Sequence, residues 1–415
     1  MINSSTPDCF DRSASFAPSG ALLENPRRST VKRPVFLLGF LLCLVVPALA
    51  QSANVSVFAT GLNNPRGLKF GPDSYLYVAE GGAGGTMSTV GDPSVTQVPF
   101  PVGPYTGGFT SRISRIAWDG TRTTVVDGLP SSQTAPTQGN LVSGVADVAF
   151  IGRKMYAILA GAGASHGLAN TDNAVLRIEQ DGDVTVVADL SIYQKNHPTA
   201  VIQPDDFEPD GTWYSMIASG GDLFAVEPNH GELDRIDPAN GHIKRIADIS
   251  ASQGHIVPCS LTYHGGDFYV GNLNTFPIVE GGAKILKISR SGHVTTFATG
   301  FTTVLGLAFD CQHRLYVLEN TTGNPFPTPG TGKVLRINCS GQVEEIASGL
   351  FLPTAMTIGP DGNLYVSNVG FGPPPVGLGQ VVKITLPECE RCGRAEDSAD
   401  ADADADGEGN GDRNR

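Results

Sequence analysis

One phrase recurs six times along this chain: a small or apolar approach, a turn, and an aromatic-rich strand that usually ends in a polar residue. The six copies occupy residues 63–80, 143–160, 212–227, 255–272, 303–320 and 352–368. Their equivalent apolar positions are Leu68, Val148, Met216, Leu261, Leu307 and Met356. Strand-like repeats with a period of about 40–50 residues are typical of propeller blades. The repeat therefore predicts a ring of similar blades.

A second hairpin follows each of the first five phrases. These hairpins occupy residues 112–129, 174–190, 233–249, 284–301 and 333–350. In each, two alternating runs flank a short turn rich in Asp, Asn, Ser and Gly, the residues that tight hairpins need. Two hairpins per repeat predict an all-β, six-bladed β-propeller with four-stranded antiparallel blades.

The sixth repeat lacks its last strand, because residues 379–387 have no strand-like successor. The missing sequence occurs at the other end, where VSVFATGL at 55–62 resembles Val294–Phe301. We therefore expect the N-terminal strand to complete the last blade, which removes a free sheet edge. The predicted propeller spans residues 51–387.

The two ends have a different composition from the ring. Residues 31–50 combine a basic flank, an apolar run and an Ala-Leu-Ala exit, the pattern of a secretory signal peptide. The apolar run is shorter than the ~20 residues of a spanning helix, so we expect export without a membrane span, to the periplasm or the medium. Residues 1–30 form an upstream extension.

Residues 388–415 form an acidic tail without apolar periodicity, which predicts disorder. Asp402, Asp404 and Asp406 match the opening of a calcium loop, but Arg413 stands where such a loop has Glu. A solvated acidic tail is the alternative interpretation.

The charge balance constrains the partners. The chain has 28 Lys and Arg against 41 Asp and Glu, a formal net charge of −13. Nucleic-acid binding depends on basic side chains at phosphates, so this composition disfavours it. We expect a monomer that binds a small molecule or a protein.

Five cysteines follow the predicted signal peptide. Cys311 and Cys339 lie in two turns on one rim of the predicted fifth blade, so export permits a disulfide between them. Cys389 and Cys392, a C-x-x-C in the tail, favour a local disulfide or free thiols over a redox role. Cys259 is left over as a buried free thiol.

Polar residues end five of the six second strands. The six equivalent positions are Glu80, Leu159, Glu227, Asn272, Glu319 and Asn368. Carboxylate and amide oxygens are calcium ligands, which makes Glu80, Glu227, Asn272 and Glu319 a possible metal set. The alternative is that these side chains bind loop backbone. Second strands lie ~4.8 Å outside the first, so opposite members should be roughly 10 Å or more apart, which favours loop capping.

The predicted channel mouth is the candidate ligand site. Its residues are Arg66, Glu80, Glu227, His255, Asn272, Glu319 and Asn368. Arg66 could bind an anionic group, and His255 could act as a base, although the sequence shows no paired acid. His166, in a long insertion, is either functional or a solvated loop residue. The chain has no G-x-S-x-G, H-E-x-x-H or phosphate-loop motif.

Three phrases carry a family resemblance: FATGLNNPRGLKFGPDSYLYVAEGG, ATGFTTVLGLAFDCQHRLYVLE and PTAMTIGPDGNLYVSNVG. Over residues 52–387 the chain resembles the exported ScyD/ScyE-type proteins, six-bladed propellers related to NHL repeats. The resemblance implies an exported propeller and transfers no catalytic residues.

Two other propeller groups offer alternative functions. Gluconolactonase-like enzymes hold a divalent cation with Glu, Asn and Asp, a part that Glu80, Glu227, Asn272 and Asn368 could play, in a different order and context. Quinoprotein sugar dehydrogenases share the opening phrase of Gly61–Phe70, but their N-H-N-G-G segment is absent here. We rank a ligand- or protein-binding propeller first, a cation-dependent lactone-type hydrolase second, and a PQQ-type dehydrogenase third. Calcium is the cofactor that the lactone-type hydrolase would require.

Overall fold

A computed structural model describes residues 51–179, 181–371 and 377–387 of the chain. The predicted signal segment 31–50, the acidic tail 388–415 and the pair Cys389 and Cys392 lie outside the described residues.

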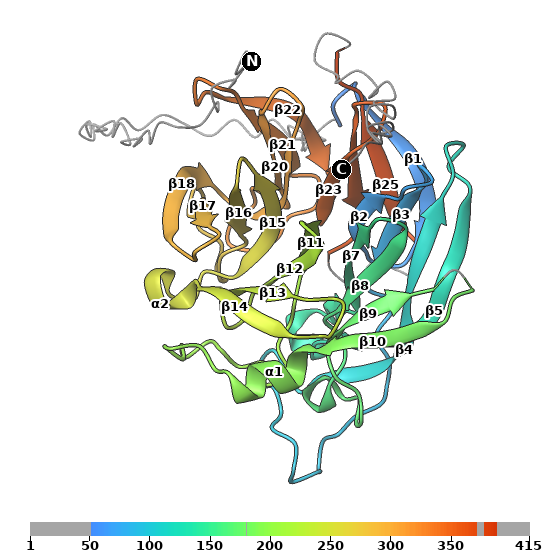
Figure 1. Ribbon diagram of the computed structural model, residues 1–415, viewed down its shortest axis with the longest axis vertical. Helices are drawn as coiled ribbons and strands as arrows, with labels where there is room; N and C mark the ends of the chain where they lie inside the picture. Colours follow the sequence, from blue (N-terminus) through green and yellow to red (C-terminus); the bar gives the residue numbers. More distant parts are fainter. Residues whose placement is uncertain (1–50, 180, 372–376, 388–415) are drawn as a thin grey trace, which may run out of the picture.

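Six antiparallel sheets stand in a ring, and the first strand of each sheet lies at its inner edge (Figure 1). From the inside outward, the first blade contains β2 (Pro65–Phe70), β3 (Leu76–Glu80), β4 (Thr106–Ile116) and β5 (Arg122–Gln133), with the two-residue strand β6 (Val142–Ser143) added. The second contains β7 (Val145–Ile151), β8 (Lys154–Leu159), β9 (Ala174–Ile178) and β10 (Val184–Asp189). The third contains β11 (Ser215–Ser219), β12 (Asp222–Glu227), β13 (Glu232–Ile236) and β14 (Ile243–Asp248).

The remaining blades repeat this order. The fourth contains β15 (Pro258–His264), β16 (Asp267–Asn272), β17 (Ala283–Ser289) and β18 (Val294–Phe301). The fifth contains β19 (Val304–Phe309), β20 (Leu315–Glu319), β21 (Gly332–Ile337) and β22 (Val343–Leu350). The sixth contains β23 (Ala355–Ile358), β24 (Leu364–Asn368), β25 (Gly379–Ile384) and β1 (Val55–Leu62). The predicted six-bladed propeller is confirmed.

The N-terminal strand closes the ring. β1 pairs antiparallel with β25, from Val55 opposite Ile384 to Leu62 opposite Gly379, with two register shifts between. Residues from opposite ends of the chain thus share one sheet, which confirms the predicted closure and covers the outer edge of β25.

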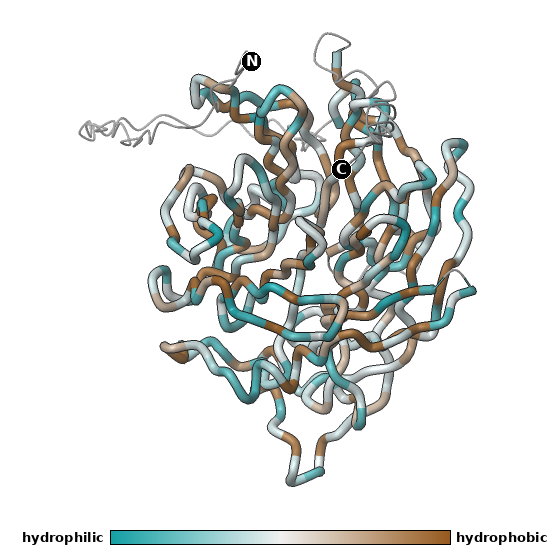
Figure 2. Tube along the Cα trace, in the orientation of Figure 1, coloured by the Kyte–Doolittle hydropathy of each residue, from teal (hydrophilic) through white to brown (hydrophobic). Residues whose placement is uncertain are grey.

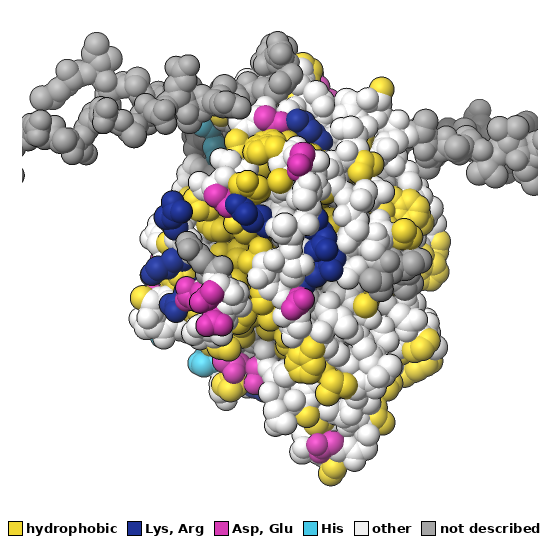
Figure 3. Space-filling view, turned by 90° about the vertical axis from the view of Figure 1, so that its right-hand side faces the viewer, with side chains coloured by type: hydrophobic (Ala, Val, Ile, Leu, Met, Phe, Trp, Pro, Cys, Tyr) yellow, Lys and Arg dark blue, Asp and Glu magenta, His cyan; other side chains and the backbone are white. Residues whose placement is uncertain are grey.

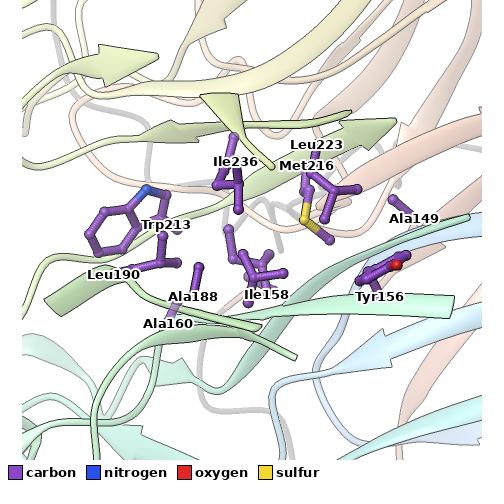
Figure 4. Close-up of a cluster of buried hydrophobic side chains, with 13 residues drawn as sticks. Ala149, Tyr156, Ile158, Ala160, Ala188, Leu190, Trp213, Met216, Leu223 and Ile236 are labelled. Carbon is purple, nitrogen blue, oxygen red and sulfur yellow. The ribbon is translucent and has the colours of Figure 1, made fainter. Parts of the chain in front are cut away.

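Apolar side chains hold adjacent blades together. Hydrophobic residues recur along the strands of the ring (Figure 2). Every residue of β20 and of β24 is buried, so these strands bury both of their faces against the neighbouring blades. Between the second and third blades, Ile158, Leu190, Trp213 and Met216 are buried in one cluster (Figure 4). The core is therefore a series of such clusters around the ring.

Helices occur only in loops of the described chain. The longer ones are α1 (Leu190–Asn196) and α2 (Ser250–Gln253), with 3-10 turns at Pro136–Gln138 and Ala164–His166. The Asp189 carboxylate caps α1 by accepting a hydrogen bond from the Ile192 N–H. Within the residues described, none of the helices has the length and apolar character needed to cross a membrane.

Three cysteines lie among the described residues. Cys311 and Cys339 are both disulfide-bonded, and the Cys339 sulfur lies 4.0 Å from the carbonyl of Gln312, the neighbour of Cys311. Their pairing with each other stays a prediction for non-reducing peptide mapping. Cys259 is free and buried.

On the side of the ring in Figure 3, basic and acidic side chains intermix, without a continuous basic stripe.

Candidate functional site

The polar residues that end the second strands act as loop caps. All five are buried. Each hydrogen-bonds the backbone just before the first strand of its own blade. The pairs are Glu80 with Asn63 N (2.5 Å), Glu227 with Thr212 N (2.8 Å), Asn272 with Ile256 O (2.8 Å), Glu319 with Thr302 N (2.5 Å) and Asn368 with Phe351 N (2.8 Å). Leu159, the sixth equivalent, is apolar and has no such role.

The other carboxylate oxygens are also engaged within their own blades. Glu80 accepts a hydrogen bond from Arg112 Nε at 2.8 Å, and Glu319 lies 3.2 Å from the Lys333 ammonium. Glu227 accepts a hydrogen bond from the His230 N–H at 2.6 Å. Over the described ranges, no group of three or more His, Cys, Asp or Glu side chains is placed to hold a metal ion. The calcium set stays a prediction that would require these carboxylates to leave their present partners.

Tyr214 crosses the end of the channel at which the first strands begin, here called the upper end. It precedes the third blade, and its hydroxyl donates to the carbonyl of Thr354 at 3.2 Å, which precedes the opposite, sixth blade. The Arg66 guanidinium lies 5.9 Å from the Tyr214 ring centroid and donates to the carbonyl of Val142. Burial raises the pKa of Tyr214 to about 12, so the phenol stays neutral. The predicted mouth is thus occupied by protein side chains.

Below Tyr214, Asp147 projects from β7 toward the first blade. Its Oδ1 accepts a hydrogen bond from Val148 N at 2.8 Å, and its Oδ2 accepts from Ser215 Oγ at 3.1 Å and Met216 N at 2.9 Å. A Cβ atom at Gly67 would lie 1.9 Å from the Asp147 Oδ1. Burial raises the pKa of Asp147, against the opposing charge of Lys69. Gly67 is therefore the residue that makes room for this carboxylate.

Three histidines near the upper loops have acidic partners that the sequence did not reveal. His255 Nδ1 lies 2.9 Å from the Asp206 carboxylate, and His230 Nδ1 lies 3.4 Å from the Glu227 carboxylate. The sequence showed no paired acid for His255, because Asp206 comes from a loop 49 positions away. A stretch of four acids at 205–210 was the signal available, but its spacing says nothing about which histidines it meets.

The third pair is His166 with Glu208. His166 is completely buried, so it is not a solvated loop residue. Its Nδ1 lies 2.8 Å from Ser132 Oγ, and its Nε2 lies 3.6 Å from the Glu208 carboxylate. Tyr105 donates to the other Glu208 oxygen at 2.7 Å. This network ties together four segments that are distant in the sequence.

Burial shifts both partners of this pair toward their neutral forms. It raises the pKa of Glu208 to about 7 and lowers the pKa of His166 to about 4. The pair combines a neutral imidazole with a carboxyl group that titrates near neutral pH. Ser132, His166 and Tyr105 are each less than a tenth exposed, so the network holds loops together and offers no open face to a substrate.

The lower end of the channel, where the first strands finish, contains a cavity of about 350 Å³. It is lined by residues near the ends of the first strands in four consecutive blades: Lys69 and Phe70, Ala149 and Phe150, Ile217 and Ala218, Thr262 and Tyr263. None of the seven predicted mouth residues lines it, because all seven lie at the upper end, where the first strands begin and the second strands finish. Sequence reasoning named residues of the upper end and did not identify this cavity. The upper ligand site stays a prediction.

No protein-family model matches the chain, and no curated protein matches it. Solved structures resemble it at low identity. XC5397 from Xanthomonas campestris, described as a gluconolactonase, is 11% identical over 80% of this chain and 89% of that chain, with a TM-score of 0.47. A calcium-binding regucalcin from Agrobacterium tumefaciens is 14% identical over 80% and 92%, also with a TM-score of 0.47.

A putative oxidoreductase from Thermus thermophilus, described as a glucose dehydrogenase, is 16% identical over 80% of this chain and 99% of that chain, with a TM-score of 0.49. Identities and TM-scores this low assign no activity to this chain.

Proposed function

We propose that this chain is an exported ligand-binding propeller whose small-molecule site is the lower end of the channel. The cavity of about 350 Å³ carries the proposal. Small-molecule sites are concave and roughly 300–1,000 Å³ in volume, and this cavity falls within that range. Export rests on the expected signal peptide at 31–50, and the ScyD/ScyE resemblance agrees with an exported propeller.

The lining of the cavity favours binding over hydrolysis. Its eight side chains include no carboxylate, imidazole or thiol. A cation-dependent hydrolase holds its metal mainly with carboxylate, imidazole or thiolate ligands, and none of these is among the lining side chains. The lactone-hydrolase alternative would instead use the upper carboxylates that now cap loops. Chelator-sensitive hydrolysis of a sugar-acid lactone by the purified protein would favour that alternative.

A neutral fluorescent probe tests whether the lower cavity binds ligands. N-phenyl-1-naphthylamine should bind the purified protein saturably. Ala218 lines the cavity and is half-buried, so Ala218→Phe should fill it and weaken probe binding by about tenfold or more, an expected loss of ~1.4 kcal/mol.

Ala239→Phe is the matched control, because Ala239 lies in an exposed turn of the same blade. It should bind the probe like the unmodified protein. Equal binding by Ala218→Phe and the control, or no saturable binding by the unmodified protein, would contradict the proposed site.

A further inference from the structure

Lys69 is the charged side chain of the lower cavity. Its charge acts to lower the pKa of the buried Asp147 carboxyl, but the Asp147 oxygens already accept hydrogen bonds from Val148 N, Ser215 Oγ and Met216 N. In the described part of the chain, the Lys69 nitrogen has no carboxylate within 4.0 Å. A half-buried lysine that lines a cavity and has no close counter-ion favours an anionic ligand group.

The acids around the same rim do not supply that counter-ion. Asp73 pairs with Arg115 at 2.9 Å, and Asp361 pairs with Lys383 at 2.7 Å. Such pairs neutralise the rim locally, although the whole chain is acidic. The positive charge of Lys69 is therefore available to a ligand that enters from this end.

Three aromatic residues line the cavity together with Lys69, and packing outside the cavity fixes the rings of two of them. Phe70 stacks on Trp118, with ring centroids 5.5 Å apart and an interplanar angle of 23°. Phe150 meets Tyr77 edge-on at 5.1 Å. Rings that are already held by neighbours lose little entropy when a ligand binds, so the walls are preorganised for a flat apolar body.

Tyr263 is the third aromatic residue of the cavity lining. Its hydroxyl accepts a hydrogen bond from Arg290 Nε at 2.7 Å. The Arg290 guanidinium also lies 5.0 Å from the ring centroid. Arg290 is therefore engaged with Tyr263, and Lys69 remains the cation that lines the cavity.

We propose that the lower channel site takes an organic anion with a flat apolar body, such as an aromatic carboxylate or sulfonate. Lys69 pairs with the anionic group, while Phe70, Phe150 and Tyr263 contact the flat part. This inference rests on the proposed function and names the ligand class of the same site.

Two probes with similar aromatic bodies test the ligand class. The anion 1-anilinonaphthalene-8-sulfonate should bind more tightly than neutral N-phenyl-1-naphthylamine, and its affinity should fall as salt is added. Lys69→Met keeps an apolar stem and removes the charge. It should raise the Kd of the anionic probe about tenfold and change the Kd of the neutral probe less than twofold.

Two further variants serve as controls. Lys244→Met removes an exposed lysine from β14, on the outside of the third blade, and should leave both affinities unchanged. Lys69→Arg keeps the charge and should keep the anionic probe within about threefold. Lys69→Gln also removes the charge, and it replaces Lys69→Met if that variant does not fold.

The outcomes separate the two proposals. Unchanged binding of both probes by Lys69→Met would overturn the anionic ligand class and leave the binding site standing. No saturable binding of either probe by the unmodified protein would overturn both. Loss of the anionic probe alone supports the inference.

Discussion

At the scale of single residues, Gly67 and Asp147 show why the channel has its present shape. The Asp147 carboxylate lies where a side chain at position 67 would begin, and it joins the second blade to the third through Ser215 and Met216. The sequence repeat located both residues at equivalent positions of two first strands. It could not show their contact, since a repeat aligns positions and does not report the spacing between neighbouring blades.

Gly67→Ala should destabilise the protein. The new Cβ would also lie 2.7 Å from the Asp147 Cα, which is backbone and cannot rotate away. Overpacking of this kind costs typically about 1–3 kcal/mol, which should lower the midpoint of thermal unfolding by several degrees.

Gly81→Ala is the control for this substitution. Gly81 is buried too, but its added Cβ would have 3.5 Å to its nearest neighbour, an ordinary contact. A Gly67→Ala variant as stable as Gly81→Ala would show that position 67 tolerates a side chain.

At the scale of elements, strands and loops differ in how far the sequence predicts them. The strands were predictable because each carries a period-two pattern bounded by turn residues. The loop caps at Glu80, Glu227 and Glu319 were predictable in kind, because they recur at one position of the repeat. The network of Tyr105, His166 and Glu208 was not, since these residues lie in insertions that no other repeat shares.

The network of Tyr105, His166 and Glu208 should make the free energy of unfolding depend on pH. Glu208 has a raised pKa of about 7 in the folded protein against 4.5 as its ordinary value. The folded state therefore binds more protons than the unfolded state between these values, and stability is lost as pH rises through 7. Between pH 6.5 and pH 8, ionisation of Glu208 should lower the free energy of unfolding by on the order of 1 kcal/mol.

Glu208→Gln should reduce this pH dependence without abolishing it. Asp234 also has a pKa raised to about 7 by burial, so a residual effect of the same sign should remain. His166 acts oppositely, because its pKa is lowered to about 4. Thermal unfolding of both proteins at the two pH values measures the difference. An identical pH dependence in the variant would contradict the role of Glu208.

At the scale of the whole molecule, the ring has two unlike ends. The repeat predicted the number of blades, their order and the closure by β1, because each of these depends on which strands pair. The proposed lower site did not follow from the repeat, and the ligand site predicted at the upper end stays a prediction. Polar residues gather at the upper end of the ring, and their number predicted a site there. In the structure they bind backbone groups and one another. The lower cavity is made of strand ends whose side chains look like ordinary core in the sequence.

Hydrogen–deuterium exchange with and without saturating 1-anilinonaphthalene-8-sulfonate tests the location of the site most directly. The proposed site predicts slower exchange at the lower ends of the first strands and their turns, near residues 69–72, 149–153, 217–221 and 262–266. The upper segments 63–65, 205–214 and 255–257 should exchange unchanged. Protection confined to the upper segments, with none at the strand ends, would contradict the account.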